Sequence, residues 1–68
     1  MNKVLFGTSH NEYTIELTYD GSMYHYFLRR AGSVLHHFVA PFDTEHEARQ
    51  WAGDIARNHL EQIEAGTI

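Results

Sequence analysis

The stretch that decides the fold is residues 13–30, YTIELTYDGSMYHYFLRR. In its first half, apolar or aromatic residues stand at every second position with polar residues between them, a period typical of a half-buried strand. These positions are Tyr13, Ile15, Leu17 and Tyr19. Asp20-Gly21 then supplies a hairpin turn, because Gly adopts the positive φ that a type I′ turn requires. The pattern predicts strands over residues 12–19 and 23–30, with a two-residue loop at Asp20-Gly21 that pairs Tyr19 with Ser22.

Two further strands are predicted to flank this hairpin. Residues 3–6 form the first, which we expect to end at Gly7-Thr8-Ser9. Residues 33–40 form the last, after a second turn that begins at Ala31-Gly32. Pro41 cannot donate to a strand ladder and marks the exit from the sheet. We therefore expect an antiparallel β-meander of three to four strands.

Residues 44–65 carry the clearest helical pattern. Thr44 and Glu47 fit the S/T-x-x-E capping box, and Gly66 suits the position just after the helix. Between them, residues able to pack recur at spacings of three and four, which makes one stripe of an amphipathic helix. The stripe consists of Ala48, Trp51, Ala52, Ile55, Ala56, His59, Leu60 and Ile63. The sequence thus predicts a single α+β domain over residues 1–68, with one C-terminal helix packed on one face of the sheet.

The turns also predict which strand residues share a face. With two-residue loops in both hairpins, directly opposite residues lie on the same side of the sheet. The side expected to take the helix holds Ile15, Leu17, Tyr24, Tyr26, Leu28, Leu35 and Val39. The second side holds Thr14, Glu16, Thr18, Met23, His25, Phe27, Arg29, Val34, His36 and Phe38. We interpret this mixed second side as a partner-binding surface or as a face covered by the first strand, the C-terminal tail or a twin subunit.

Composition limits the classes of function. The 68 residues suffice for one core, and the absence of cysteine excludes disulfides and thiolate chemistry. Nothing approaches an 18-residue apolar run or a signal peptide, so we expect a cytoplasmic protein without a membrane segment. The net charge of −4 divides into +2 over residues 21–42 and −4 over residues 43–68, with −2 before them. The central hairpin is therefore mildly basic, and the helix is acidic.

Catalytic and metal-binding patterns are weak. Three pairs place a serine near a histidine in the sequence: Ser9-His10, Ser22-His25 and Ser33-His36. None has the strained nucleophile turn or the third partner that activation of a serine requires. Glu16, His25 and His36 would form a zinc or iron ligand set on the second side, but only in one strand register. We predict no enzymatic activity, no metal and no cofactor.

A DNA-binding module is one alternative. A three-stranded sheet backed by a helix can lay its free face in the DNA major groove. The segment from Phe42 to Trp51 also looks like the strand-to-helix junction of integrase arm-binding and AP2-like domains. The sheet offers mainly Arg29 and Arg30 to phosphates, so such binding would be weak and salt-sensitive. We therefore expect direct nucleic-acid binding less than protein binding.

Three segments resemble a small phage-encoded anti-CRISPR protein of the type I-F group. They are Ser9-His10-Asn11-Glu12-Tyr13, Tyr19-Asp20-Gly21-Ser22, and Phe42-Asp43-Thr44-Glu45 with Trp51. In that protein a His and a Tyr precede a strand, and a Tyr-acid-Asn-Gly-Ser turn follows it, with one residue fewer before the turn here. Nineteen residues then lead to a Phe-Asp and a Trp, and residues 23–41 are the same nineteen here.

This resemblance covers most of residues 9–51 and implies an antiparallel sheet packed on a helix. It also implies an inhibitor that sits on the backbone subunits of a type I CRISPR surveillance (Cascade) complex and blocks target-DNA binding. The functional tyrosine of the family corresponds to Tyr19, and an aromatic residue of its first strand lies near Leu5 or Phe6. A functional glutamate of the family falls at Arg29, which is a departure.

From the resemblance and the second side of the sheet together, we predict the partner contacts and the setting in which they act. The contact residues are Tyr19, Phe6, Arg29, Phe27, His25 and Glu16. The protein would be encoded by a phage or mobile element and act in the host cytoplasm. A homodimeric accessory protein is the third interpretation.

Overall fold

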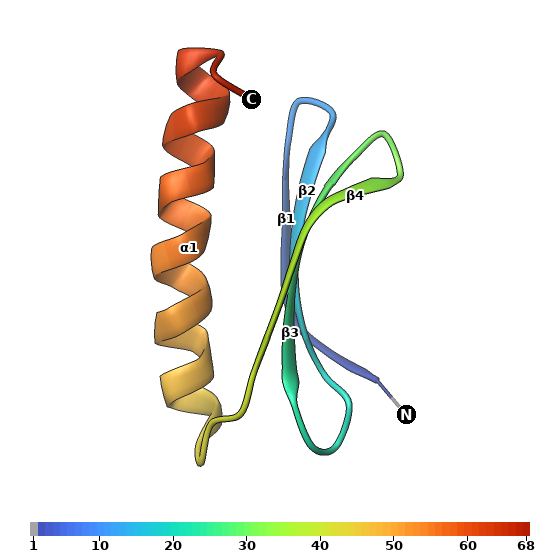
Figure 1. Ribbon diagram of the computed structural model, residues 1–68, viewed down its shortest axis with the longest axis vertical. Coiled ribbons are helices and arrows are strands. Elements are labelled where there is room, and N and C mark those ends of the chain that lie inside the picture. The colour runs from blue at the N-terminus through green and yellow to red at the C-terminus, as the bar shows by residue number, and fades with distance from the viewer. Residues whose placement is uncertain (1) are drawn as a thin grey trace.

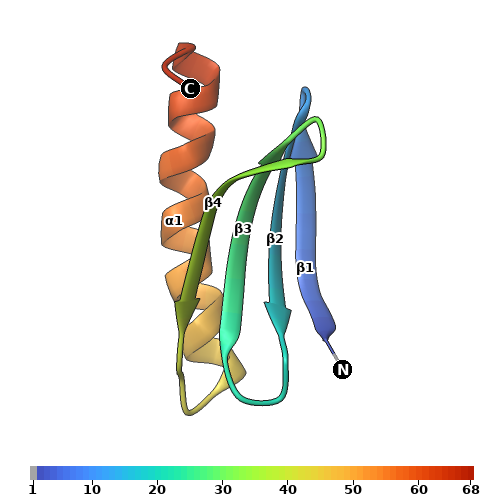
Figure 2. The same ribbon diagram turned by 45° about the vertical axis from the view of Figure 1, so that its right-hand side comes forward.

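The computed structural model describes residues 2–68 as a four-stranded antiparallel sheet followed by one helix. The elements are β1 (Lys3–His10), β2 (Tyr13–Tyr19), β3 (Tyr24–Arg30), β4 (Ser33–Ala40) and α1 (Glu45–Ala65). The strands lie in the order β1-β2-β3-β4, and α1 runs along one face of the sheet (Figures 1 and 2). The predicted α+β meander with a C-terminal helix is confirmed.

The first strand is longer than predicted. Residues 3–6 were expected to form it, with an end at Gly7-Thr8-Ser9, but β1 continues through these residues to His10. Gly7, Thr8 and Ser9 pair with residues 14–16 of β2, and the chain turns only at Asn11, whose φ is 56°. Pairing with a neighbouring strand overrides the weak local preference of Gly and Ser, since strand propensity depends strongly on context.

The hairpin between β2 and β3 has a four-residue loop instead of the predicted two. Tyr19 pairs with Tyr24, and Met23 belongs to the loop. The carboxylate of Asp20 accounts for the wider turn, because its Oδ1 accepts hydrogen bonds from the amides of Ser22 (2.9 Å) and Met23 (2.7 Å). An even-length loop leaves the side-chain directions unchanged, so the predicted faces of these two strands are correct.

The hairpin between β3 and β4 changes the predicted faces. Its turn has two residues as predicted, with positive φ at Ala31 (50°) and Gly32 (87°). One step further, Arg29 pairs with Val34 but Leu28 pairs with His36, so Leu35 is an extra, bulged residue. A shift of one residue turns every following side chain to the other side of the sheet.

The prediction for β4 is therefore wrong from Leu35 onward. His36 and Phe38, predicted on the second side, lie opposite Leu28 and Tyr26 on the side of the helix. Val39, predicted to face the helix, lies opposite His25 on the other side. Leu35 and Val39 do not join the core and are exposed.

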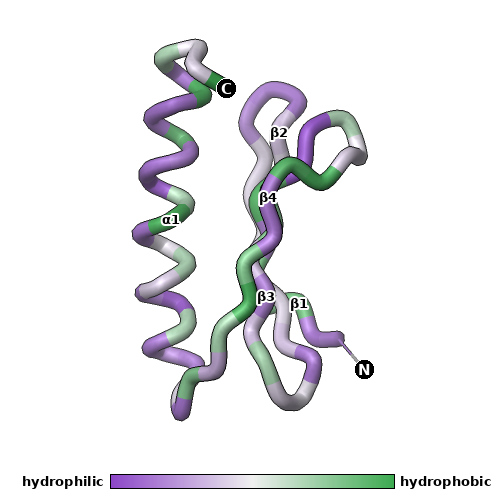
Figure 3. The backbone as a smooth tube through the Cα atoms, in the orientation of Figure 1, coloured by the Kyte–Doolittle hydropathy of each residue, from purple (hydrophilic) through white to green (hydrophobic). Residues whose placement is uncertain are grey.

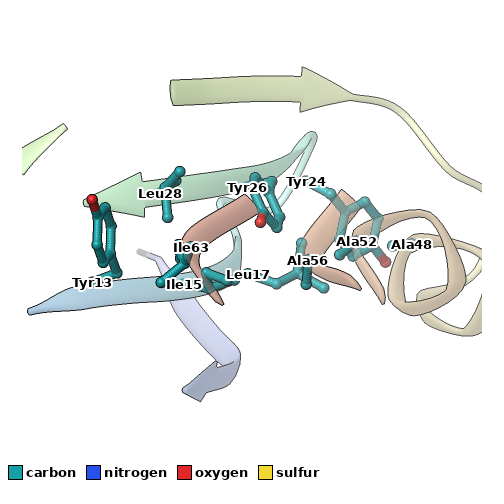
Figure 4. Close-up of a cluster of buried hydrophobic side chains, with 10 residues drawn as sticks. All are labelled: Tyr13, Ile15, Leu17, Tyr24, Tyr26, Leu28, Ala48, Ala52, Ala56 and Ile63. Carbon is teal, nitrogen blue, oxygen red and sulfur yellow. The ribbon is translucent and has the colours of Figure 1, made fainter. Parts of the chain in front are cut away.

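The core lies between β2, β3 and α1. The strands contribute Tyr13, Ile15, Leu17, Tyr24, Tyr26 and Leu28, and the helix contributes Ala48, Ala52, Ala56 and Ile63 (Figure 4). All five predicted core positions of these two strands are buried. Small alanines on α1 allow the helix backbone to approach the sheet, and the large strand side chains fill the space between them.

The helix begins and ends where the sequence places its signals. Thr44 is the N-cap, and its Oγ1 accepts a hydrogen bond from the amide of Glu47 (3.3 Å). At the other end Gly66 has a φ of 74°, and its amide bonds back to the last turn of α1. This left-handed closure satisfies carbonyls that the helix would otherwise leave unpaired.

The N-cap gives a direct test of how the helix is held. Replacing Thr44 by Ala removes the acceptor for the Glu47 amide, and we expect the free energy of unfolding to fall by about 1 kcal/mol. Thr44→Ser retains the hydroxyl and should stay close to the wild type. Urea unfolding followed by circular dichroism measures both variants. Equal stability of the Ala and Ser variants would contradict a stabilising cap.

Candidate partner-binding face

The face of the sheet opposite α1 carries the densest group of polar and aromatic side chains. We call it the open face. It is lined by Thr14, Glu16 and Thr18 of β2, by His25, Phe27 and Arg29 of β3, and by Val34, His37 and Val39 of β4. Neither β1 nor the C-terminal tail covers it: β1 extends the sheet sideways, and the backbone oxygen of Ile68 accepts a hydrogen bond from the buried Tyr13 on the helix side. The predicted cover by the first strand or the tail is therefore wrong.

Four side chains of the open face stack on one another in a row, which we call the ladder: Arg29, Phe27, His37 and His25. The guanidinium carbon of Arg29 lies 4.3 Å from the ring centroid of Phe27. The rings of Phe27 and His37 are 4.3 Å apart with an angle of 10° between their planes, and those of His37 and His25 are 5.2 Å apart at 18°. Such near-parallel planes at van der Waals distance limit the rotation of each side chain.

Carboxylates hold both ends of the ladder. At one end Arg29 donates to Glu16 Oε1 at 3.3 Å. At the other end His25 Nε2 lies 2.6 Å from Asp20 Oδ2, and His25 Nδ1 lies 2.9 Å from His37 Nε2. A carboxylate only accepts, so Nε2 of His25 donates to Asp20; Nδ1 of a neutral His25 then accepts from His37.

Asp20 stays ionised down to low pH. Hydrogen bonds from the Met23 amide first, then from His25 and from the Ser22 amide, lower the pKa of this carboxyl to about 2. The same carboxylate thus closes the β2–β3 turn with one oxygen and orients His25 with the other. The turn and the ladder are one structure.

The six predicted contact residues divide between the two faces. Glu16, His25, Phe27 and Arg29 lie on the open face, and three of them belong to the ladder. Tyr19 and Phe6 lie on the helix side instead. Tyr19 stacks on Tyr24 with ring centroids 4.5 Å apart, and both Tyr19 and Phe6 pack against the core as half-buried residues.

Sequence reasoning missed two members of this site. A regular pairing after the Ala31-Gly32 turn places His37 opposite Tyr26 on the helix side, and nothing in the local sequence marks the bulge at Leu35 that turns it outward. Asp20 is predicted only as part of a turn and as an acidic surface residue. The carboxylate of an Asp at the start of a turn commonly accepts a hydrogen bond from the backbone amide two residues later, and this preference could have indicated its role. The sequence therefore contains a signal for the role of Asp20 but none for the outward position of His37.

The three residues considered as a metal ligand set, Glu16, His25 and His36, do not come together. Glu16 lies opposite Phe27, and His36 lies on the helix side, away from both Glu16 and His25. Across residues 2–68, no three His, Cys, Asp or Glu side chains are arranged to hold a metal ion. The surface of residues 2–68 also has no pocket.

A second histidine pair lies on the helix side of β4. The rings of His36 and His59 are 5.2 Å apart at 14°, and His59 Nδ1 lies 2.8 Å from the hydroxyl of Tyr26. Burial raises the pKa of Tyr26 to about 12, so its hydroxyl remains protonated and can donate to His59. Burial, and secondarily the neighbouring His36, lower the pKa of His59 below 6.5. Strand β4 therefore meets a histidine of another element on each of its faces.

The helix α1 is not long and apolar enough to cross a membrane, and no other helix occurs in the described part of the chain.

The lowered pKa of His59 predicts a pH dependence of stability. Below pH 6.5 the unfolded chain binds a proton at His59 more readily than the folded chain does. The free energy of unfolding therefore decreases as the pH is lowered below 6.5. Above 6.5 the full contribution is present. Urea unfolding between about pH 5 and pH 7.5 should show this slope in the wild type.

The matched variants are His59→Gln and His46→Gln on the same helix. Gln at position 59 can accept from Tyr26 but does not titrate, so we expect a flatter pH dependence. His46 is exposed, and its replacement should leave the slope unchanged. An unchanged slope in His59→Gln would show that another group causes the pH dependence.

Comparison with protein-family models, with curated proteins and with solved structures finds no match to this chain.

Proposed function

We propose that the protein is a non-enzymatic binding module that docks on a protein partner through the open face. The observation that carries this proposal is the ladder, which holds an arginine, a phenylalanine and two histidines in fixed, stacked positions. Arginine and aromatic residues dominate the energetics of protein interfaces. Side chains that are already ordered lose little conformational entropy on binding, which favours affinity from a small surface.

The charges of the sheet favour a protein over a nucleic acid as the partner. Arg29 pairs with Glu16, and Arg30 donates to Glu12 Oε1 from both Nε (3.0 Å) and Nη2 (2.7 Å). These are the two cations that a DNA-reading sheet would need for phosphates. Their carboxylate partners would repel a phosphate backbone, and the net charge of −4 adds to this repulsion.

The partner that we propose is the one implied by the resemblance in residues 9–51: a bacterial type I CRISPR surveillance (Cascade) complex. The protein would bind its backbone subunits stoichiometrically and block target-DNA binding. Subunits that hold guide RNA present Lys and Arg. Glu16 and Asp20 at the ends of the ladder, and Glu12 in the β1–β2 turn, supply opposite charge. In this proposal Glu16, His25, Phe27 and Arg29 make the contacts, and Tyr19 and Phe6 support the sheet from the helix side.

Binding to the purified surveillance complex tests the proposal. Biolayer interferometry should show saturable binding of the wild type, and Arg29→Ala or Phe27→Ala should weaken it by at least about 10-fold, as expected for central interface residues. Arg57→Ala is the matched control, because Arg57 on α1 is 73% exposed and pairs only with Asp54 among the described residues. Circular dichroism verifies that each variant is folded.

The two parts of the proposal fail separately. If the wild type does not bind the complex, and its expression does not rescue phage plaquing on a CRISPR-active host, the proposed partner is wrong. If it binds but Arg29→Ala and Phe27→Ala bind equally well, the open face is not the interface. A gel shift on short DNA duplexes at two salt concentrations addresses the alternative, and salt-sensitive shifting of free DNA would favour a DNA-binding module.

A further inference from the structure

The two edges of the sheet differ in how well they are protected against pairing with another strand. β1 is interrupted by a bulge between Val4 and Phe6, begins with Lys3, and has the carbonyl of Leu5 occupied by a hydrogen bond from Arg49 Nη2 (3.1 Å). Bulges, charges and covering side chains are the usual devices that keep an edge strand from pairing. The β1 edge therefore carries three such devices.

The β4 edge carries far fewer. Residues 31–42 contain no Asp, Glu, Lys or Arg, and Pro41 stands after the strand and not within it. The bulge at Leu35 lies near the start of β4 and leaves residues 36–40 in regular pairing with β3. The outer backbone groups of this segment face no other strand of the described chain. A long, uncharged edge of this kind is a template for strand addition.

Exposed apolar side chains concentrate on the same strand. Seven of the eight β4 residues are exposed. Four of the five large hydrophobic residues that are exposed in residues 2–68 belong to it: Val34, Leu35, Phe38 and Val39. Figure 3 shows hydrophobic segments at both ends of β4 with a hydrophilic segment between them, and the sequence of β4 has His36 and His37 at its centre. Phe38 lies on the helix side and Val39 on the open face, so only a neighbour that adds to the edge itself would cover both.

We propose that β4 pairs antiparallel with β4 of a second copy of this chain, which joins two sheets into one of eight strands. Charge selects the occupant. The acidic residues lie on β2 and in the turns at its two ends, on α1 and just before it, and none lies on β4. Two identical chains of net charge −4 therefore meet with least repulsion along the uncharged β4. An antiparallel pair of identical strands is also self-complementary, because each strand offers its partner the same apolar residues and backbone groups.

The symmetry of this pairing determines the shape of the dimer. An antiparallel pair within one continuous sheet is related by a two-fold axis perpendicular to the sheet, so both helices lie on one side and both open faces on the other. The dimer would present two ladders on one surface. The inference is independent of the proposed partner, because the residues of the edge are not those of the ladder, apart from His37.

The expected dimer is weak. A stable interface buries about 800 Å² on each partner. The whole chain exposes 4361 Å², and a single edge strand supplies only a small part of that surface. Sedimentation velocity of the full chain from about 5 to about 500 µM should therefore show a concentration-dependent shift from the 7.9 kDa monomer toward twice that mass.

Two lysine variants locate the contact. Val39→Lys places a charge on the exposed β4 edge, where Val39 is 45% exposed, and should weaken dimerisation at least about 10-fold. Val4→Lys is the matched control on the β1 edge, where Val4 is 59% exposed, and should dimerise like the wild type. Circular dichroism establishes that both variants are folded. Amide hydrogen exchange in the wild type should show protection of residues 36–40 that increases with concentration.

Three results would overturn this proposal. If the wild type remains monomeric at the highest concentration in the sedimentation experiment, the proposed dimer does not form. A dimer that Val4→Lys abolishes and Val39→Lys leaves intact uses the other edge. A monomeric wild type whose binding to the surveillance complex is weakened by Leu35→Lys, at an exposed β4 residue outside the open face, would show that the partner, and not a second copy, occupies β4. Arg29→Ala should not alter dimerisation, so this test is separate from that of the proposed function.

Discussion

The contact on which the rest of the fold depends is that of Tyr26 with the helix. Tyr26 is completely buried in the middle of β3, and its ring contacts Trp51 and His59 of α1 and Phe38 of β4. Its hydroxyl and His59 Nδ1 form a hydrogen bond 2.8 Å long in the core. The other buried contacts of α1 with the sheet are apolar and do not depend on direction, whereas this buried hydrogen bond fixes how the helix lies on the strands. A polar pair that is satisfied only in one arrangement specifies that arrangement.

The bulge at Leu35 adds the second constraint, since it decides what each face of the sheet carries. With His36 and Phe38 turned toward the helix, β4 contributes to the surroundings of His59. With His37 turned outward, Phe27 gains a stacking partner and His25 gains a hydrogen bond. Without the extra residue, His36 would take a position on the open face and His37 would lie under the helix. The ladder exists because the bulge exchanges them.

The same arrangement explains why the surface is divided into two regions of different character. On the open face Phe27 is stacked between Arg29 and His37, and the carboxylates of Glu16 and Asp20 hold Arg29 and His25 in place. This produces an ordered, polar-aromatic surface. Along the β4 edge Val34, Leu35 and Val39 are exposed, and the outer backbone groups face no other strand of the described chain, so the edge favours strand addition. The two regions suit different partners, and His37 lies where they meet.

The local sequence determined most of the fold. Alternation at every second residue placed β2 and β3, spacings of three and four placed α1, and the capping residues Thr44 and Gly66 set its ends, because each of these signals acts within a few residues. The open-face positions of Glu16, His25, Phe27 and Arg29 followed from the same alternation. The length of β1 did not follow from the local sequence, because it depends on pairing with β2. Nor did the side-chain directions of β4, because they depend on one extra residue that the packing of Tyr26, Phe38 and His59 accommodates. Side-chain direction along a strand inverts with a single inserted residue, and only the tertiary structure decides where that residue is placed.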